Sequence, residues 1–246
     1  MDLMEFLYRV MEELSNAGVP IVFKGAMILN LAIRENNPSN VERVTRDIDG
    51  DWVGELSTME AMESVLRNAV EKVDSSLSVR SSRAFGERKS AGFKIINENG
   101  EKIASIDLSI RQNRFCTPYI SYVSGVTIEG ASLSKMLSDK LYAISRENVC
   151  RRMKDVLDIY VLSFIAKIDA SELQQIWEEN GRVLGDFEAY KTHLAELKEA
   201  YDKMKGIKNK PEFLEIYHRV SDVIWELESK RKIEVPNQEN QGNFNK

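Results

Sequence analysis

Two aspartates that stand two positions apart, Asp47 and Asp49, are the first candidates for catalytic residues. They stand in segment 41–53, where Ile48 and Trp52 are consistent with a β-strand, so both carboxylates project from one face of that strand. Two carboxylates held this close repel each other unless a cation or a proton relieves them. Hard oxygen ligands suit magnesium, which typically takes one or two carboxylates plus substrate phosphates.

A third carboxylate, Asp107, lies between apolar neighbours in a predicted strand over 102–110. If that strand neighbours the first, Asp107 completes a three-carboxylate cage of the kind that holds two metal ions for phosphoryl transfer. The alternative is that Asp47 and Asp49 are surface charges paired with Arg43 or Arg46.

A strand, a glycine and a helix follow one another upstream of these acids. Residues 19–23 are typical of a short buried strand, Lys24-Gly25 of a tight turn and residues 26–33 of a helix. A helix N-terminus presents unpaired amides and a partial positive charge, so Lys24, Gly25 and Ala26 form a candidate phosphate-binding turn.

The composition argues against several other kinds of site and partner. The 246 residues include 34 Lys and Arg against 39 Asp and Glu, a net charge of −5 that argues against a protein that coats nucleic acid through bulk positive charge. Two cysteines without metal-ligand spacing and two histidines leave little for a zinc site or a His-based triad. We find no signal peptide and no membrane span, so we expect a cytoplasmic protein with no membrane partner.

The remaining pattern predicts an α/β (α+β) fold with a mixed sheet, followed by helices. Helices are expected from Asp2 to about residue 16 and over 57–73, with Ser57 as the cap of the second. Further strands are expected over 77–85, 92–97 and 102–110 and further helices over 132–147, 151–168, 170–180, 186–204 and 211–232. We divide the chain into an α/β core (1–130), a helical domain (131–235) and a disordered tail (236–246).

Positive charge is concentrated in two segments of this acidic chain, 80–94 and 140–154, each with a local charge of +4. The first interleaves Phe85 and Phe93 with its basic residues, so it could follow a nucleic-acid backbone and stack a base, or it could be the exposed face of a hairpin. The tryptophans Trp177 and Trp225 fall in amphipathic helices and are expected in the core.

Four strings in order, FKGAMILNLAI, RVTRDIDGD, SIDLSI and KLYAISRENVCRRMKDVLDIYVL, resemble the AbiEii/AbiGii nucleotidyltransferase family, toxins of abortive-infection and toxin–antitoxin systems. The resemblance spans roughly residues 20 to 165. Its most specific part is RxTxDxD, whose Arg43 and Thr45 would by this resemblance contact the nucleotide, followed by KxxAxxR and KDxxDxY.

The resemblance implies a polymerase-β-like nucleotidyltransferase core in which Asp47 and Asp49 hold two magnesium ions and Asp107 is the third acid. Gly25 would shape the turn over the triphosphate of the NTP substrate. Many nucleotidyltransferases carry Gly-Gly or Gly-Ser at that turn, whereas Gly25 is followed by Ala26, which loses one hydroxyl ligand.

In the helical motifs, the resemblance implies that Lys140 contacts the nucleotide phosphates. Asp155 and Asp158 would fix the basic residues of their helix or act at the site. On a continuous helix Arg151 and Asp155 would also pair, four residues apart.

Our leading hypothesis is a magnesium-dependent nucleotidyltransferase toxin that transfers a nucleoside monophosphate from an NTP to an acceptor hydroxyl, by resemblance the 3′ end of a tRNA, with a cognate antitoxin as partner. One alternative is modification of a protein or small-molecule hydroxyl. Another is a catalytically silent nucleotide-binding or interaction module.

Overall fold

A computed structural model describes residues 1–36, 41–55, 57–84, 90–110 and 113–234. The chain divides into two compact units, Met1–Met136 with Lys205–Lys210, and Leu137–Met204 with the residues from Pro211 onward. The boundary at 130/131 stays a prediction, and the tail at 236–246 lies outside the described residues.

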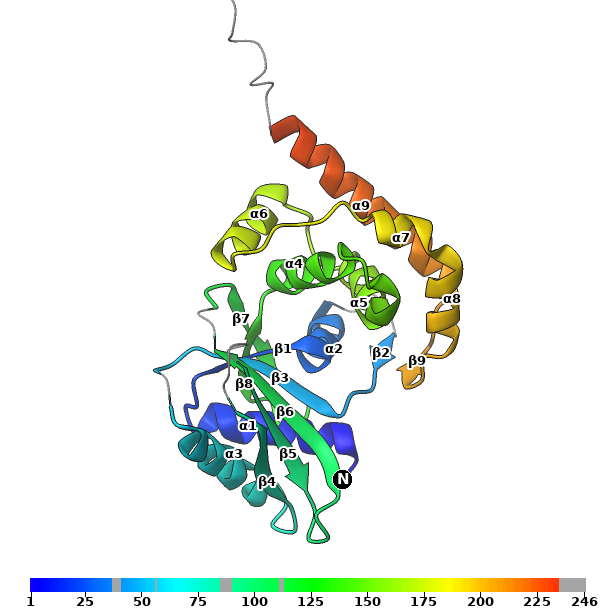
Figure 1. Cartoon of the computed structure of the whole chain (residues 1–246). Helices are drawn as coiled ribbons and strands as arrows, with labels where there is room; N and C mark the ends of the chain where they lie inside the picture. The colour runs from blue at the N-terminus through cyan, green and yellow to red at the C-terminus, as the bar shows by residue number, and fades with distance from the viewer. Residues whose placement is uncertain (37–40, 56, 85–89, 111–112, 235–246) are drawn as a thin grey trace, which may run out of the picture. The chain divides into compact units, whose positions relative to one another are not determined.

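The first unit is built on a seven-stranded mixed sheet in the order β4-β5-β6-β3-β1-β8-β7, which confirms the expected fold class (Figure 1). The β3–β6 and β1–β8 pairs are parallel, and the other neighbours are antiparallel. Its strands are β1 (Ile21–Lys24), β3 (Asp47–Trp52), β4 (Ser78–Arg83), β5 (Ser90–Ile96), β6 (Lys102–Ile110), β7 (Cys116–Ile120) and β8 (Thr127–Ala131).

Three helices accompany this sheet: α1 (Leu3–Asn16), α2 (Gly25–Asn36) and α3 (Met59–Val73). Helix α1 begins where the sequence predicts, because the Asp2 side chain accepts a hydrogen bond from the Glu5 backbone N–H. The predicted cap of α3 is wrong by one residue: Thr58, not Ser57, accepts from the Ala61 N–H.

The outer edge of β4 is closed by two side chains of α3. The Ser81 N–H donates to Glu63 Oε2 at 2.7 Å, and Arg67 donates to the Val79 carbonyl at 3.3 Å. Because these groups occupy backbone donors and acceptors of an edge strand, they oppose the addition of a further strand there.

Several elements differ from the sequence interpretation. The predicted strand 41–53 is two strands, because β2 (Glu42–Arg43) pairs with β9 (Ile207–Lys208) in a separate ribbon and only β3 enters the large sheet. The sequence interpretation did not include β7 and β8. These are short strands, and Pro118 interrupts the β-forming pattern of β7.

The second unit is helical, as expected. It contains α4 (Leu133–Ile144) from Leu137 onward, the 3₁₀ helix η1 (Val149–Arg152), α5 (Met153–Leu162), α6 (Ala170–Glu179), α7 (Glu188–Thr192), α8 (Leu194–Asp202) and α9 (Phe213–Glu234). The single helix predicted over 186–204 is therefore two. No helix in the described ranges is long and apolar enough to cross a membrane.

The two tryptophans of this unit differ in burial. Trp177 is in the core and its Nε1 donates to the Ser138 carbonyl at 3.0 Å, as expected for a buried indole. Trp225 is 69% exposed, so its predicted core position is wrong. The buried face of α9 runs through Val220, Val223 and Leu227, and Trp225 projects away from it.

Candidate active site

Strand β3 presents Asp47 and Asp49 on one face, as the period of two predicts. Both are partly exposed, while Ile48 on the other face is fully buried. The Ser105 hydroxyl of β6 donates to Asp47 Oδ1, and Thr45 Oγ1 accepts from the Asp47 N–H at 3.1 Å. Thr45 thus orders the backbone where β3 begins, although its predicted role was toward the nucleotide.

Asp107 lies on β6 directly in register with Asp49, one strand spacing of about 4.8 Å away. The predicted adjacency of the two acidic strands is therefore present. Asp107 forms an ion pair with Arg83 of β4 at 2.8 Å. In the described residues, no three His, Cys, Asp or Glu side chains are grouped so that they could hold a metal ion as they stand.

These residues nevertheless fit a hard cation by their chemistry, since three carboxylates come from neighbouring positions of two paired strands. Asp47 and Asp49 would hold the ion, and Asp107 would have to leave Arg83 to join them. When bound, magnesium neutralises triphosphate charge and activates a hydroxyl for attack.

Gly25 brings the backbone against Asp49. Its φ is +73°, a left-handed conformation that favours glycine, and a β-carbon built on it would lie 2.5 Å from Asp49 Oδ2. Helix α2 begins at Gly25 itself, so its first turn, which includes Ala26, starts beside this carboxylate. The first amides of a helix have no partner within the helix. A helix start beside a candidate cation site is suited to the phosphates of a nucleotide.

Lys24, predicted in the phosphate-binding turn, has a buried partner that sequence reasoning missed. Its ammonium group forms an ion pair with Asp51 and donates to Ser109 Oγ at 2.9 Å. Asn113 Nδ2 donates to the other Asp51 oxygen at 3.1 Å. Asp51 is only 2% exposed, so the carboxylate of this ion pair is buried. The signal was available, because Asp51 continues the spacing of two begun by Asp47.

Arg43 is fixed through its backbone. The side chain of Asn30, which is buried in α2, donates to the Arg43 carbonyl at 3.0 Å and accepts from the Arg43 N–H at 3.4 Å. These bonds hold the segment before β3, and the predicted nucleotide contact of Arg43 stays a prediction.

The second unit brings together the other three predicted site residues. Lys140 Nζ on α4 lies 2.6 Å from Asp155 Oδ1 and 2.8 Å from Asp158 Oδ2, both on α5. Burial by itself lowers the pKa of Lys140, but the two carboxylates, Asp158 first, outweigh it and hold the pKa above its usual value. Asp155 is also 3.8 Å from Arg152 rather than paired with Arg151, because residues 149–152 form a 3₁₀ helix instead of the start of α5.

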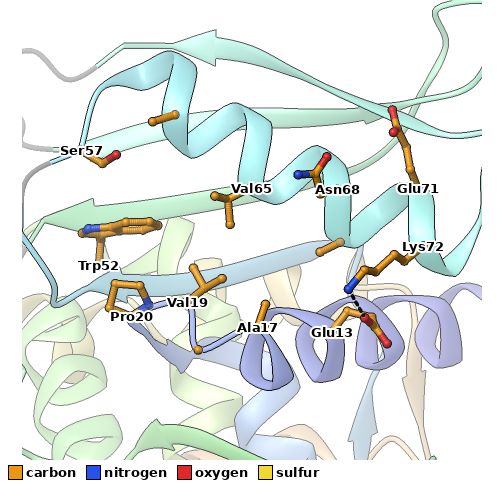
Figure 2. A pocket seen from close by; sticks show the side chains of 13 residues that line it. Glu13, Ala17, Val19, Pro20, Trp52, Ser57, Val65, Asn68, Glu71 and Lys72 are labelled. Carbon is orange, nitrogen blue, oxygen red and sulfur yellow. Dashed lines mark ion pairs between the residues drawn. The ribbon is translucent and has the colours of Figure 1, made fainter.

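A cavity of about 780 Å³ lies elsewhere in the first unit, between the end of α1, the start of β1 and α3 (Figure 2). Its lining includes Val19, Trp52 and Val65, with the Glu13–Lys72 ion pair at 3.3 Å beside them. Trp52 projects from the face of β3 opposite the aspartates, so this cavity is separate from the carboxylate site.

The fold is that of solved nucleotidyltransferase-like structures. JHP933 from Helicobacter pylori is 11% identical, with a TM-score of 0.55 over 94% of both chains. A second H. pylori structure, a putative nucleotidyltransferase, is 10% identical, with a TM-score of 0.53 over 94% of this chain and 96% of that one. MenT4, a nucleotidyltransferase toxin from Mycobacterium tuberculosis, is 13% identical, with a TM-score of 0.55 over 92% of this chain and 83% of that one.

The family follows from a match over most of the chain. Residues 5–219 match the model of the AbiEii family, described as nucleotidyl transferase AbiEii toxin of a type IV toxin–antitoxin system, and the chain belongs to this family. Family membership confirms the resemblance and identifies a nucleotidyltransferase of the toxin class, for which the description implies an antitoxin partner. A comparison with curated proteins gave no match.

Proposed function

We propose that this protein transfers a nucleoside monophosphate from an NTP to the 3′ hydroxyl of an RNA acceptor, a tRNA, with pyrophosphate as the leaving group and magnesium as cofactor. The observation that carries the proposal is the joint placement of Asp47, Asp49 and Asp107 on one face of β3 and β6, with Gly25 and the start of α2 against Asp49.

Different residues of the chain have different roles in the proposed reaction. Asp47 and Asp49 supply oxygen ligands for the cation, and the first amides of α2 bind phosphate oxygens by hydrogen bonding and the helix dipole. Asp107, which lies on the neighbouring strand β6, orients the attacking hydroxyl of the acceptor. Lys140, whose pKa its two carboxylate partners hold above the usual value, is proposed from the family resemblance to stabilise the charge on the departing pyrophosphate.

Asp47→Ala tests the proposal. We expect the incorporation of radiolabel from an NTP into tRNA to fall to background, because one of two adjacent cation ligands is lost. The unfolding curve should change little, since Asp47 is partly exposed. The matched control is Asp202→Ala, which removes an exposed aspartate of α8 and should leave transfer intact.

Transfer to tRNA that survives in Asp47→Ala contradicts the mechanism. Testing each labelled NTP with a cell lysate separates the acceptors: label in protein or in a small molecule would overturn the RNA acceptor but keep the chemistry. Binding of an NTP with no transfer to any fraction would identify a silent module, which the Gly25-Ala26 turn would permit.

A further inference from the structure

The two strands beyond β6 carry exposed positive charge on the face of the carboxylates. In the sheet register, Arg80 of β4 is opposite Lys94 of β5, and Lys94 is opposite Ser105 of β6. Ser105 is the hydrogen-bond partner of Asp47 on β3. Directly opposed residues project from the same face of a sheet. Arg80 and Lys94 therefore lie on the face that presents Asp47.

A third cation joins this row to the carboxylates. Arg83 is opposite Gly92, which is opposite Asp107. Because Gly92 has no side chain, the guanidinium of Arg83 can cross β5 and reach Asp107, where it forms the 2.8 Å ion pair while remaining 52% exposed. We name Arg80, Arg83 and Lys94 the cationic strip.

The positive charge of the cationic strip is not balanced by acidic residues of its own two strands, β4 and β5. The described residues of β4 and β5, SVRSSR and SAGFKII, contain three cations and no acid. Arg80 and Lys94 are exposed to solvent, whereas the alternate residues Val79, Phe93 and Ile95 are completely buried on the other face. In a chain with a net charge of −5, this local excess favours a polyanionic partner.

The side chains of the cationic strip indicate contacts with phosphates rather than stacking on bases. Phe93, the predicted stacking aromatic, is buried on the opposite face, and Phe85, Arg88 and Lys89 lie outside the described residues. Guanidinium and ammonium groups bind phosphates, and contacts to phosphates carry no information about the bases. The backbone edge of β4 is occupied by Glu63 and Arg67, so the surface does not favour a peptide that adds as a strand.

We propose that the cationic strip binds the phosphate backbone of the acceptor RNA next to its reacting end and leads it across β4 and β5 to the carboxylates. Three strand spacings, about 14 Å, separate β4 from β3, which leaves room for a few nucleotides. The inference rests on the proposed transfer to RNA, and it adds the surface that holds the acceptor and the absence of base readout.

The test measures the affinity of the full chain for a fluorescein-labelled tRNA by anisotropy at several salt concentrations. The double variant Arg80→Ala/Lys94→Ala should weaken binding at least tenfold and reduce the slope of log K against log salt by about 2, one for each lost phosphate contact. Calorimetric NTP affinity should be unchanged. Arg80→Lys/Lys94→Arg, which keeps both charges, should bind like the wild type.

Lys198→Ala/Lys203→Ala is the matched control, because it removes two exposed cations from α8 and changes the net charge equally. Wild-type affinity and slope in the strip variant, or an equal loss in the control, overturns the proposal. A wild-type protein that does not bind tRNA also overturns the proposal. Displacement of tRNA from the wild type by polyglutamate, added at the same concentration of negative charge, does so too. Binding through the strip without nucleotide transfer would refute the proposed function and leave the cationic strip as an RNA surface.

Discussion

At the scale of residues, Gly25 is where the backbone approaches a candidate cation ligand. An alanine there has to adopt a positive φ, which costs roughly 1 kcal/mol, and its β-carbon displaces the Asp49 carboxylate. We expect Gly25→Ala to lose about this much free energy of unfolding in urea and to lose nucleotide transfer.

Gly100 provides the matched control, since its φ is +79° but nothing lies within 4 Å of an added β-carbon. Gly100→Ala should show the same loss of stability with transfer intact. Equal activity in the two variants would show that the contact between Gly25 and Asp49 has no catalytic importance.

The Lys140 cluster is a second feature at this scale. Replacing Lys140 with Met leaves Asp155 and Asp158 side by side, 14% and 2% exposed, without their shared cation. Breaking a buried ion pair in this way costs about 3–5 kcal/mol. We expect urea denaturation to show a loss of that order in Lys140→Met.

The double variant Lys140→Met/Asp158→Asn removes the more buried charge as well and should recover part of the lost stability. A single variant that unfolds at the wild-type urea concentration would show that the cluster contributes nothing to the fold. Any role of Lys140 would then be in the transfer reaction and not in the stability of the fold.

At the scale of elements, the ribbon of β2 and β9 fixes the segment before the acidic strand. Glu42 accepts hydrogen bonds from Lys208 at 3.0 Å and from Arg34 at 3.2 Å. Burial raises the pKa of Glu42, but the two cations outweigh it and hold the pKa below its usual value. A lowered pKa means that the stabilisation is present above about pH 4.5, the usual value, and is lost as the pH falls through the lowered one.

Glu42→Gln removes this titration. We expect the variant to be less stable than the wild type by up to about 1 kcal/mol at neutral pH, because both cations are more than a third exposed. The two should converge once the pH has fallen below the lowered pKa of Glu42. Urea denaturation between pH 3 and pH 7 measures this. A difference that does not depend on pH would contradict the role of the carboxylate charge.

At the scale of the whole molecule, each unit carries one free thiol, Cys116 in the first and Cys150 in the second. Cys116 is exposed and Cys150 is half-buried. Partial burial raises the pKa of both thiols, with Glu129 adding to the effect at Cys116 and Glu196 at Cys150. A raised pKa lowers the thiolate fraction at a given pH, and the thiolate is the reactive species.

We therefore expect both cysteines to react with a maleimide at pH 7 more slowly than free cysteine does, and to speed up as their own unit unfolds in urea. Mass spectrometry of each peptide follows the two units separately, and Cys116→Ser isolates the signal of Cys150. Native rates equal to that of free cysteine would contradict the predicted shifts.

The sequence determined what depends on the local chain. The period of two on a strand is a property of the backbone, so it placed Asp47 and Asp49 on one face, and the ordered motifs identified the nucleotidyltransferase family before any fold was known. The apolar periodicity likewise predicted α1 and the helical second half.

Which side chains meet depends on how distant segments pack together in the folded chain. The pairing of β3 with β6 put Asp107 beside Asp49, and the pairing of β4 with β5 and β6 brought Arg83 to the same carboxylate. The packing of α4 against α5 gave Lys140 two acidic partners, and the rotation of α9 left Trp225 in solvent. Register and helix orientation are set by the burial of whole faces against distant segments, and no spacing within a single motif encodes them.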